Sequence, residues 1–347
     1  MRHASSILKL LLFFSIGILL AWLALRNITP EQKQQTFNSL RQANYYWMIL
    51  SLTILLISHW LRAVRWKMLL EPLGHNPKTY NTFFAVLVGY LVNLAVPRLG
   101  EVSRCGVLTK YEKVPLDKAV GTVIAERAVD MIFLILAFLL TFLLEFKTIY
   151  GFANEKIFNP LKNKIFSIVD NPLKITILLL VTAALIASSI FLWKKLQGKI
   201  VSKFKDVLMG FWNGLKSIKD IKSPGKFIFY SLSIWFMYYA GLQISFFAFE
   251  ETAHLGAGEA LSVLTFGTLG IIFVPAGGIG AYQILVQETL KVFGVSEAGA
   301  TAFAWAVWAV SSIISVLVFG FAALLLLAVL NRNQASGDRS QEKESAG

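Results

Sequence analysis

The sequence is poor in the residues that build metal centres and covalent cross-links. Its 347 residues include a single cysteine, Cys105, and four histidines. One cysteine excludes an internal disulfide framework and a zinc site built on cysteines. The histidines follow no HExxH or His-x-Asp spacing, so a histidine metal centre is not expected and no cofactor is predicted.

Charge is also scarce, at 15% of the residues, whereas a soluble domain carries about 25%. Hydrophobic residues make up 56%, and several apolar runs are long enough to cross a bilayer. The chain is therefore predicted to be an all-α, polytopic protein of the cell inner (cytoplasmic) membrane. The net charge of +13 comes from basic residues between the apolar runs, which favours membrane lipids over nucleic acid as partners.

Two of the expected apolar helices are too short to span. These two, 82–97 and 260–275, each end in a proline followed by glycines, and they reach about 24 Å against a hydrocarbon core of about 30 Å. Both are predicted to enter the membrane and turn back, the second continuing into a short apolar piece at 279–293. No convincing cleavage site follows the first run, so it is interpreted as an uncleaved helix and not as a signal peptide. The six full spans are predicted at 7–25, 44–64, 119–145, 173–193, 227–249 and 301–330.

The distribution of lysine and arginine supports this topology. If both short helices turn back and the N-terminus is cytoplasmic, the connecting segments place 23 basic residues inside and 7 outside. If every helix crosses once, the better orientation gives 18 inside and 13 outside. Because basic loops favour the cytoplasmic side, both termini are predicted to be cytoplasmic. The lysines of 146–172 fit this arrangement least well.

The two short helices also resemble each other. GYLVNLAVPRLG (89–100) and GTLGIIFVPAGG (267–278) share five residues at a constant spacing of 178. The breaks are assigned to Pro97, Gly100 and Pro275. In the predicted topology one hairpin enters from the cytoplasm and the other from outside, which is typical of an inverted-repeat transporter with its site between the halves. Coincidence in a chain rich in glycine, leucine and valine is the alternative.

Residues 1–330 are predicted to form one transmembrane domain, and 331–347 a disordered cytoplasmic tail. Within the domain, the lysine-rich segment 194–226 has apolar residues at three- or four-residue steps. A basic amphipathic helix on the cytoplasmic leaflet fits this pattern, and so does a connecting helix packed on the bundle. A partner lipid-modifying synthase and a homo-oligomer are left open.

Charged residues interrupt the fourth apolar run, in AERAVD (125–130). Glu126 and Asp130 are four residues apart and share one helix face, and Arg127, three residues before Asp130, can pair with it. Each charge near the bilayer centre costs about 2.5–3.5 kcal/mol, so three unpaired charges cost about 8–10 kcal/mol. They are expected to pair, face water or bind a ligand. A purely structural ion-pair cluster is the alternative.

The stretch AVPRLGEVSR (95–104) supplies partners for these charges. Arg98, Glu101 and Arg104 follow Pro97, at or beyond the tip of the first hairpin. Backbone groups freed at a proline are tolerated only where the segment is buried in protein or lines a wet cavity. Since a planar guanidinium suits phosphate oxygens, Arg98 or Arg104 could hold a lipid phosphate that nearby carboxylates help to release. Arginines that snorkel to the interface are the alternative.

The second hairpin offers backbone amides in place of charges. In VPAGGIGAYQ, Gly277, Gly278 and Gly280 precede a helix whose N-terminus is a reasonable contact for an anion. Gln283 lies in the first turn of that helix and joins the candidate site. Close helix packing is the alternative. No βαβ unit surrounds these glycines, so they are not a nucleotide-binding fingerprint.

A further stretch, HWLRAVRWKMLL (59–70), ends the second expected helix. Its Arg62, Arg65, Trp60 and Trp66 are interpreted as anchors at the membrane interface. A contact with a lipid headgroup is the alternative.

With these stretches in place, the chain resembles the flippase-like transmembrane family of lysylphosphatidylglycerol synthases. The resemblance covers about residues 50–330 and implies movement of a lipid or lipid-linked headgroup between leaflets. The family often has a glutamate after the glycine run, where this chain has Gln283. The aminoacyl-transferase portion of the bifunctional synthases is missing, so lipid synthesis by this chain alone is not expected. The matching motifs are RAVRWKMLL (62–70), VGYLVNLAVPRLGEVSR (88–104), AVGTVIAERAVD (119–130) and PAGGIGAYQ (275–283).

Three functions compete. The favoured one is a lipid translocase, a transporter and not an enzyme, in which basic residues lie near the headgroup phosphate and acidic residues balance them. The second is a membrane-embedded glycosyl- or phosphotransferase that uses the carboxylates. The third is an accessory subunit that scaffolds a partner through its lysine-rich helix. The charged residues of the first hypothesis are Arg98, Arg104, Arg127, Glu101, Glu126 and Asp130.

Overall fold

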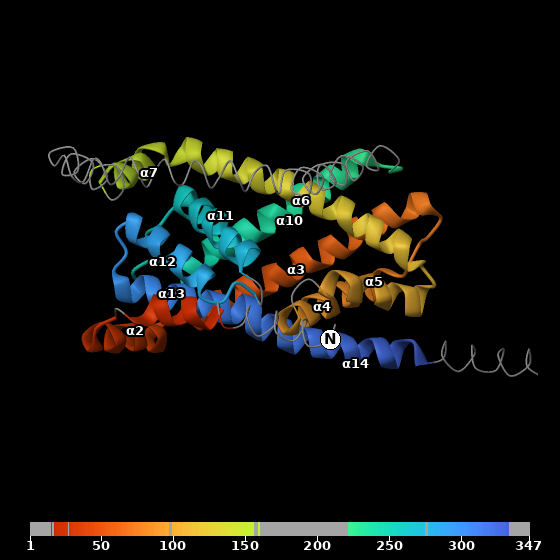
Figure 1. Ribbon diagram of the computed structural model, residues 1–347, viewed down its shortest axis with the longest axis horizontal. Helices are drawn as coiled ribbons and strands as arrows, with labels where there is room; N and C mark the ends of the chain where they lie inside the picture. The colour runs from red at the N-terminus through yellow and green to blue at the C-terminus, as the bar shows by residue number, and fades with distance from the viewer. Residues whose placement is uncertain are drawn as a thin grey trace, which may run out of the picture. The chain divides into compact units, whose positions relative to one another are not determined.

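The computed structural model describes residues 15, 17–26, 28–96, 99–155, 159, 221–274 and 277–332, all of whose regular elements are helices (Figure 1). The chain divides into two compact units, and each is described by itself. The first unit comprises residues 1–144 and 214–347, and the second comprises residues 145–213. In the described part of the second unit the helix is α7 (Phe146–Ala153). Whether residues 1–330 act as one domain stays a prediction.

The first unit holds the remaining labelled helices and an apolar helix at Gly17–Arg26. A π-helical turn, η4, joins α13 to α14 without a break. The labelled elements are α2 (Pro30–Gln42), α3 (Tyr45–Leu70), η1 (Glu71–Leu73), α4 (Thr79–Ala95), α5 (Leu99–Glu112), α6 (Leu116–Leu144), α10 (Pro224–Phe246), α11 (Ala257–Phe273), α12 (Ala281–Val292), α13 (Glu297–Trp308), η4 (Ala309–Ile314) and α14 (Ser315–Leu330).

Four helical stretches are long and apolar enough to cross a membrane, namely Tyr45–Leu73, Leu116–Leu144, Pro224–Phe246 and Glu297–Leu330. They confirm the polytopic helical class, and each covers one of the expected spans. The span expected at 7–25 is described only in part, and the span expected at 173–193 lies outside the described residues. The amphipathic helix expected at 194–226 also lies outside them, apart from its last residues.

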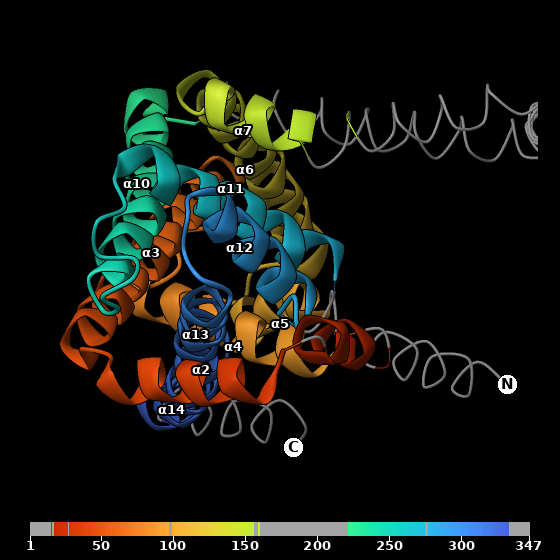
Figure 2. The same ribbon diagram turned by 90° about the vertical axis from the view of Figure 1, so that its left-hand side faces the viewer.

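Local sequence sets where these helices begin. The side chain of Asn44 accepts a hydrogen bond from the backbone amide of Tyr46 at 3.2 Å and so caps α3. Before α2, Thr29 and Gln32 exchange side-chain and backbone hydrogen bonds in a capping box. α2 has no buried residue, and it lies across the end of α13 (Figure 2), where Thr36 donates to the carbonyl of Ala298.

The two short apolar helices each fold back on the helix that follows. α4 packs on α5, and α11 packs on α12. A side chain at Gly100 would collide with the carbonyl of Gly89, and one at Gly270 would come within 2.7 Å of the backbone nitrogen of Tyr282. Glycine at these positions therefore allows the two arms of each hairpin to touch along their backbones.

The two hairpins point in opposite directions along the long helix Glu297–Leu330. At one end, Asn81 in the first turn of α4 exchanges hydrogen bonds with Asn331. At the other end, Lys291 near the end of α12 pairs with Glu297 at 2.8 Å. Figure 1 shows the α4–α5 hairpin opening towards the right and the α11–α12 hairpin towards the left. The arrangement is inverted, as predicted.

The tips of the hairpins meet near the middle of that long helix. The indole nitrogen of Trp308 donates to the carbonyl of Gly277 at 2.7 Å. A Cβ on Gly277 would lie 3.6 Å from Ser312 in the π-helical turn and 3.8 Å from Leu94 in the last turn of α4. The loop of the second hairpin thus adjoins both the π-helical turn and the tip of the first hairpin. How deep the tips lie in a bilayer stays a prediction.

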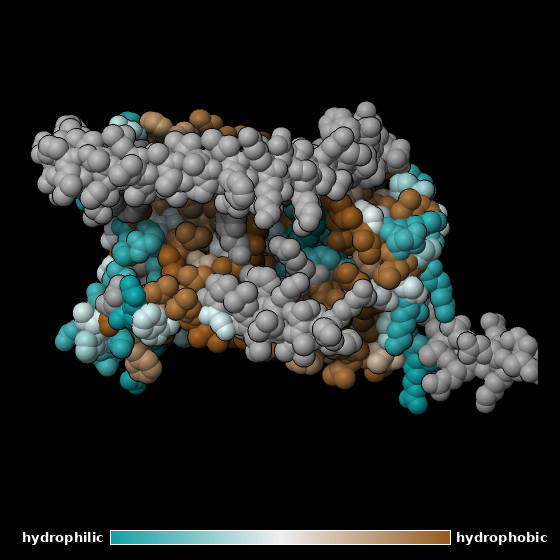
Figure 3. All heavy atoms as spheres, viewed as in Figure 1, coloured by the Kyte–Doolittle hydropathy of each residue, from teal (hydrophilic) through white to brown (hydrophobic). Residues whose placement is uncertain are grey.

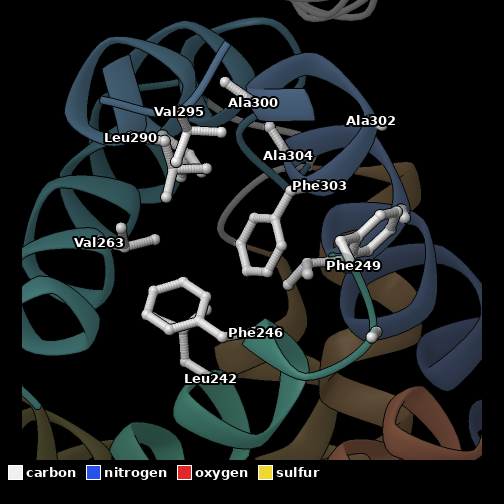
Figure 4. Packing of buried hydrophobic residues seen from close by; sticks show 14 of the residues in the cluster. Leu242, Phe246, Phe249, Val263, Leu290, Val295, Ala300, Ala302, Phe303 and Ala304 are labelled. Atoms are coloured by element: carbon white, nitrogen blue, oxygen red, sulfur yellow. The ribbon is translucent and has the colours of Figure 1, made fainter. Parts of the chain in front are cut away.

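A buried hydrophobic cluster packs Val263 and Leu290 of the second hairpin with α10 and α13, whose aromatic rings meet in it (Figure 4). Phe303 of α13 lies with its ring centre 5.2 Å from that of Phe246 and 5.8 Å from that of Phe249. All three side chains are buried. Such ring pairs contribute about 0.5–1.5 kcal/mol beyond their area burial.

The visible face of the described part of the first unit (Figure 3) is apolar between its two ends, as expected of a membrane-spanning bundle. In Figure 3 hydrophobic residues lie between hydrophilic residues gathered at two opposite ends of the described part of the first unit. Many exposed side chains of α6 are large and apolar, among them Leu139 and Leu143. By contrast, Asn331, the first residue of the expected disordered tail, is buried and hydrogen-bonded. The tail itself stays a prediction. Residues 333–347 lie outside the described part.

Candidate functional site

Four helices bring charged side chains together inside the first unit. α6 supplies the two carboxylates, α3 supplies two arginines, α5 supplies one arginine, and α10 contributes a hydroxyl group. We call this set the charged cluster. Its members are Arg62, Arg65, Arg104, Glu126, Asp130 and Tyr238.

Glu126 lies at the centre of the charged cluster and is fully buried. One carboxylate oxygen accepts from Arg62 and, at 3.2 Å, from Arg65. The other accepts from Arg104 at 3.0 Å. One carboxylate therefore connects α6 to both α3 and α5.

Asp130 pairs with the same two arginines of α3, one turn further along α6. Its two oxygens accept from Arg62 at 2.8 Å and from Arg65 at 2.7 Å. The prediction that Glu126 and Asp130 share one face is correct. Arg62 also donates to the hydroxyl of Tyr238 at 3.1 Å, which links the pair to α10.

The charged cluster carries more positive than negative charge. Its three arginines face two carboxylates, so one positive charge is in excess. Among the described residues, the buried Nε atoms of Arg62, Arg65 and Arg104 have no hydrogen-bond partner. Buried charges are normally paired and hydrogen-bonded, so an anion is the group that would complete this site.

Trp66 fixes the position of Arg104. The guanidinium carbon of Arg104 lies 4.6 Å from the centre of the Trp66 ring, which is a cation–π contact. The indole nitrogen donates to the hydroxyl of Thr122 at 2.8 Å. Trp66 thereby joins α3, α5 and α6 beside the charged cluster.

The expectation that Arg62, Arg65 and Trp66 anchor the helix at the membrane interface is wrong. Arg62 is 4% exposed and Arg65 and Trp66 are 0% exposed, all three inside the protein. A signal was available in the sequence. Two arginines three residues apart on one apolar helix complement two carboxylates four residues apart on another.

The expectation that Arg127 pairs with Asp130 is also wrong. Arg127 donates to Glu101 of α5 at 3.1 Å, and the two side chains are 45% and 30% exposed. Residue 127 points about 100° around the helix from residue 126, so it leaves the charged cluster and faces α5. We call Arg127 and Glu101 the outer pair.

The outer pair separates two pockets. The first, about 10 Å³, is lined by both outer residues, Arg104 and residues of the α4–α5 hairpin. A volume of this size admits about one water molecule. The second, about 200 Å³, is lined by the outer pair and by apolar side chains of α5 and α6. The hairpin residues of the first pocket are Val86, Gly89, Tyr90, Asn93 and Gly100.

The first hairpin holds its tip with a side-chain bond. Asn93 accepts from the backbone amide of Gly100 at 2.7 Å, next to the close contact with Gly89. Pro97 and Arg98 lie outside the described residues, so the hairpin break at Pro97 and the phosphate contact of Arg98 stay predictions.

The glycine run of the second hairpin forms a left-handed turn. Gly277, Gly278 and Gly280 have φ angles of +73°, +76° and +81°, which residues other than glycine rarely adopt. Gln283 accepts from the amide of Gly280 at 2.7 Å, and its buried Nε2 has no partner among the described residues. Pro275 lies outside the described part.

The structure brings together only part of the predicted site. Arg104, Glu126 and Asp130 lie within one network of ion pairs, and Glu101 and Arg127 form a separate ion pair beside it. The glycine turn instead contacts the end of α4 and the π-helical turn, and no recorded contact among the described residues joins it to the charged cluster. Anion binding by the glycine turn stays a prediction.

Comparison with known proteins places the chain in a family. A profile described as the lysylphosphatidylglycerol synthase TM region matches residues 6–320. A protein described as a UPF0104 membrane protein, from Methanocaldococcus jannaschii, is 22% identical over 342 residues, which cover 93% of this chain and 95% of that protein. No solved structure matches the chain. On the extent of the profile match, this chain belongs to the lysylphosphatidylglycerol synthase transmembrane-region family.

Proposed function

We propose that this protein is a lipid translocase that moves a phosphate-bearing headgroup between the leaflets of the membrane. The observation that carries the proposal is the excess positive charge of the charged cluster, buried among helices long enough to span a bilayer. A charge at that depth is costly and marks a site for a ligand.

The chemistry of the charged cluster suits a phosphate. A phosphodiester headgroup brings one negative charge, which equals the excess of the cluster. A guanidinium offers a planar fork of donors that matches two phosphate oxygens. Arg104 is one of the three arginines whose Nε has no hydrogen-bond partner among the described residues, and it lines the pocket beside the outer pair.

The carboxylates give the arginines a second set of partners. When no lipid is bound, Glu126 and Asp130 neutralise most of the positive charge. When a phosphate arrives, it competes with these carboxylates for the same donors, so binding stays weak enough for release. A transporter requires this balance because it must let go of what it binds.

The size of the inner pocket adds a requirement for motion. About 10 Å³ is too small for a phosphate, so helices must part before a headgroup can reach Arg104. Two inverted hairpins with adjoining tips are a common basis for alternating access. We assign the protein to the inner membrane with both termini cytoplasmic, with membrane lipids as its partners. A lipid-modifying synthase and a second copy of the chain are further candidate partners.

Reconstituted vesicles test the proposal. Purified protein is placed in vesicles that contain trace lipids labelled on the acyl chain with a reducible fluorophore, and a membrane-impermeant reductant reports the outer leaflet. We expect faster loss of the protected signal than in protein-free vesicles. Asp130→Asn should slow this movement, whereas Glu288→Gln, at an exposed ion pair, should not. No movement of any phosphate-bearing lipid above the protein-free rate would contradict the proposal.

The same preparation tests the enzymatic alternative. Purified protein with Mg²⁺ and lipid-linked sugars, analysed by mass spectrometry, should yield no new product. Turnover abolished by Asp130→Asn would favour a glycosyl- or phosphotransferase over a translocase. Mass spectrometry of lipids that co-purify would identify the headgroup.

A further inference from the structure

We propose that the outer pair, Glu101 and Arg127, is a side gate through which a single phospholipid reaches the charged cluster from within the bilayer. One acyl chain lies in the apolar pocket between α5 and α6, and the lipid phosphate replaces Glu101 as the partner of Arg127. The inference rests on the proposed function and names the route by which that function obtains its substrate.

The pocket between α5 and α6 has the character of an acyl-chain site. Apart from the outer pair, the described residues that line it are Val102, Val120, Val123 and Ile124, and its volume is about 200 Å³. Val102 and Ile124 are 45% and 49% exposed, so the pocket opens on the outside of the helix pair. Because α6 is a candidate membrane span, this opening faces lipid and not water.

The outer pair lies where the headgroup of such a lipid would sit. Glu101 and Arg127 line the apolar pocket, and both also line the small pocket that contains Arg104. A chain in the apolar pocket therefore ends at Arg127, and the next cation inward is Arg104. A lipid would thus meet the apolar pocket first, then Arg127 as the partner of its phosphate, and then Arg104 of the charged cluster.

The outer pair is easier to open than the inner pairs. Its side chains are 45% and 30% exposed, whereas Glu126 and Arg65 are 0% exposed. Glu126, by contrast, accepts hydrogen bonds from three arginines, so more contacts must break before it releases a partner. Glu101 is held by one recorded bond to Arg127, and its second oxygen is buried without a partner among the described residues. Exchange of this carboxylate for a phosphate would cost little and would vacate space beside Arg104.

The apolar pocket also allows the site to discriminate between a lipid and a free anion. Inorganic phosphate could contact Arg127 and Arg104 but would gain nothing from four aliphatic side chains. A diacylglycerol could fill the pocket but would offer Arg127 no negative charge. The gate therefore fits a molecule that has both parts.

Binding to full-length protein in a phosphate-free maltoside detergent tests the pocket. The probes are phosphatidylglycerol, inorganic phosphate and diacylglycerol, with affinity measured by native mass spectrometry. Ile124→Trp fills the pocket and should weaken phosphatidylglycerol by about tenfold. Ile135→Trp is the matched control, since Ile135 lies on the same helix, is 52% exposed and should leave the affinity unchanged. The two other probes should bind weakly to all forms.

Two variants of the outer pair test the gate. Glu101→Gln frees Arg127 and should tighten phosphatidylglycerol by about threefold or more. The exchanged double variant Glu101→Arg with Arg127→Glu keeps an ion pair, so it should melt like the unaltered protein. It places a carboxylate on α6 where the phosphate should bind, and it should lose about tenfold or more in affinity.

The outcomes separate this inference from the proposed function. Equal affinity in Ile124→Trp and Ile135→Trp, unaltered binding in the exchanged variant, or inorganic phosphate binding as tightly as the lipid would overturn the gate. Inter-leaflet movement at the normal rate in Ile124→Trp would overturn the gate and leave translocation intact. Lipid binding that follows the predicted pattern without inter-leaflet movement would support the gate and refute translocation.

Discussion

Two sets of ion pairs lie side by side on α6, and they differ mainly in how deeply the protein buries them. The charged cluster centres on Glu126, which has no exposed surface, and the outer pair joins Arg127 to Glu101 with 45% and 30% of their side chains exposed. Both sets use arginine and carboxylate at similar distances. Burial, and not geometry, therefore separates a structural anchor from a contact that can exchange.

The largest effect is expected when the centre of the charged cluster is neutralised. Glu126→Gln removes the partner of three arginines and leaves them facing one carboxylate. We expect a loss of about 3–5 kcal/mol in the free energy of unfolding, the usual cost of breaking a buried pair. Thermal denaturation in detergent measures it. A melting temperature equal to that of the unaltered protein would contradict the importance of burial.

A smaller loss is expected from Asp130→Asn. Asp130 is 12% exposed in its side chain and serves two arginines that both keep Glu126. The amide oxygen can still accept one bond, so we expect a cost of about 2 kcal/mol. The same melting experiment measures it. A loss larger than that of Glu126→Gln would show that Asp130 is the centre of the cluster.

The support of the charged cluster is tested by Thr122→Val. This change leaves the buried indole N–H of Trp66 without its acceptor, which costs about 1–2 kcal/mol. Thr109→Val is the matched control, because the hydroxyl of Thr109 donates only to the carbonyl of Cys105 in its own helix. Chemical denaturation of both variants gives the difference. Equal stability would exclude Trp66 as a support for Arg104.

The smallest effect on stability is expected at the outer pair. Arg127→Gln should cost about 1 kcal/mol, because it removes one recorded hydrogen bond between two partly exposed side chains. Melting curves measure it, with Glu288→Gln as a comparison at another exposed pair. A loss as large as that of Glu126→Gln would place the outer pair in the same class as the charged cluster.

The fold followed from features that are local in sequence. Apolar length predicted the four spans found among the described residues, and the proline and glycine breaks predicted the two hairpins with their shared glycine pattern. Gly89 and Gly100 were matched to glycines of the second hairpin only by their spacing in the sequence. In the structure their backbones lie in close contact. Such features are predictable because chain length and backbone sterics do not depend on distant neighbours.

The partners of the charged residues were harder to predict. The shared face of Glu126 and Asp130 follows from helical periodicity. The destinations of Arg62 and Arg127 depend on which helices pack against α3 and α6, and the sequence does not state that. From sequence alone, an arginine near a helix end is interpreted as an interfacial anchor. Only the helix packing shows that a carboxylate of another helix lies opposite it.

The π-helical turn in the middle of Glu297–Leu330 allows one helix to pack against two hairpins that point in opposite directions. A π-turn adds one residue to an α-helical turn and so rotates everything beyond it by about 100°. α13 packs on α12, and α14, past the turn, packs on α4. Deleting one residue between 309 and 314 would make the helix a continuous α-helix. The packing faces of α13 and α14 would then no longer be turned towards both hairpins at once.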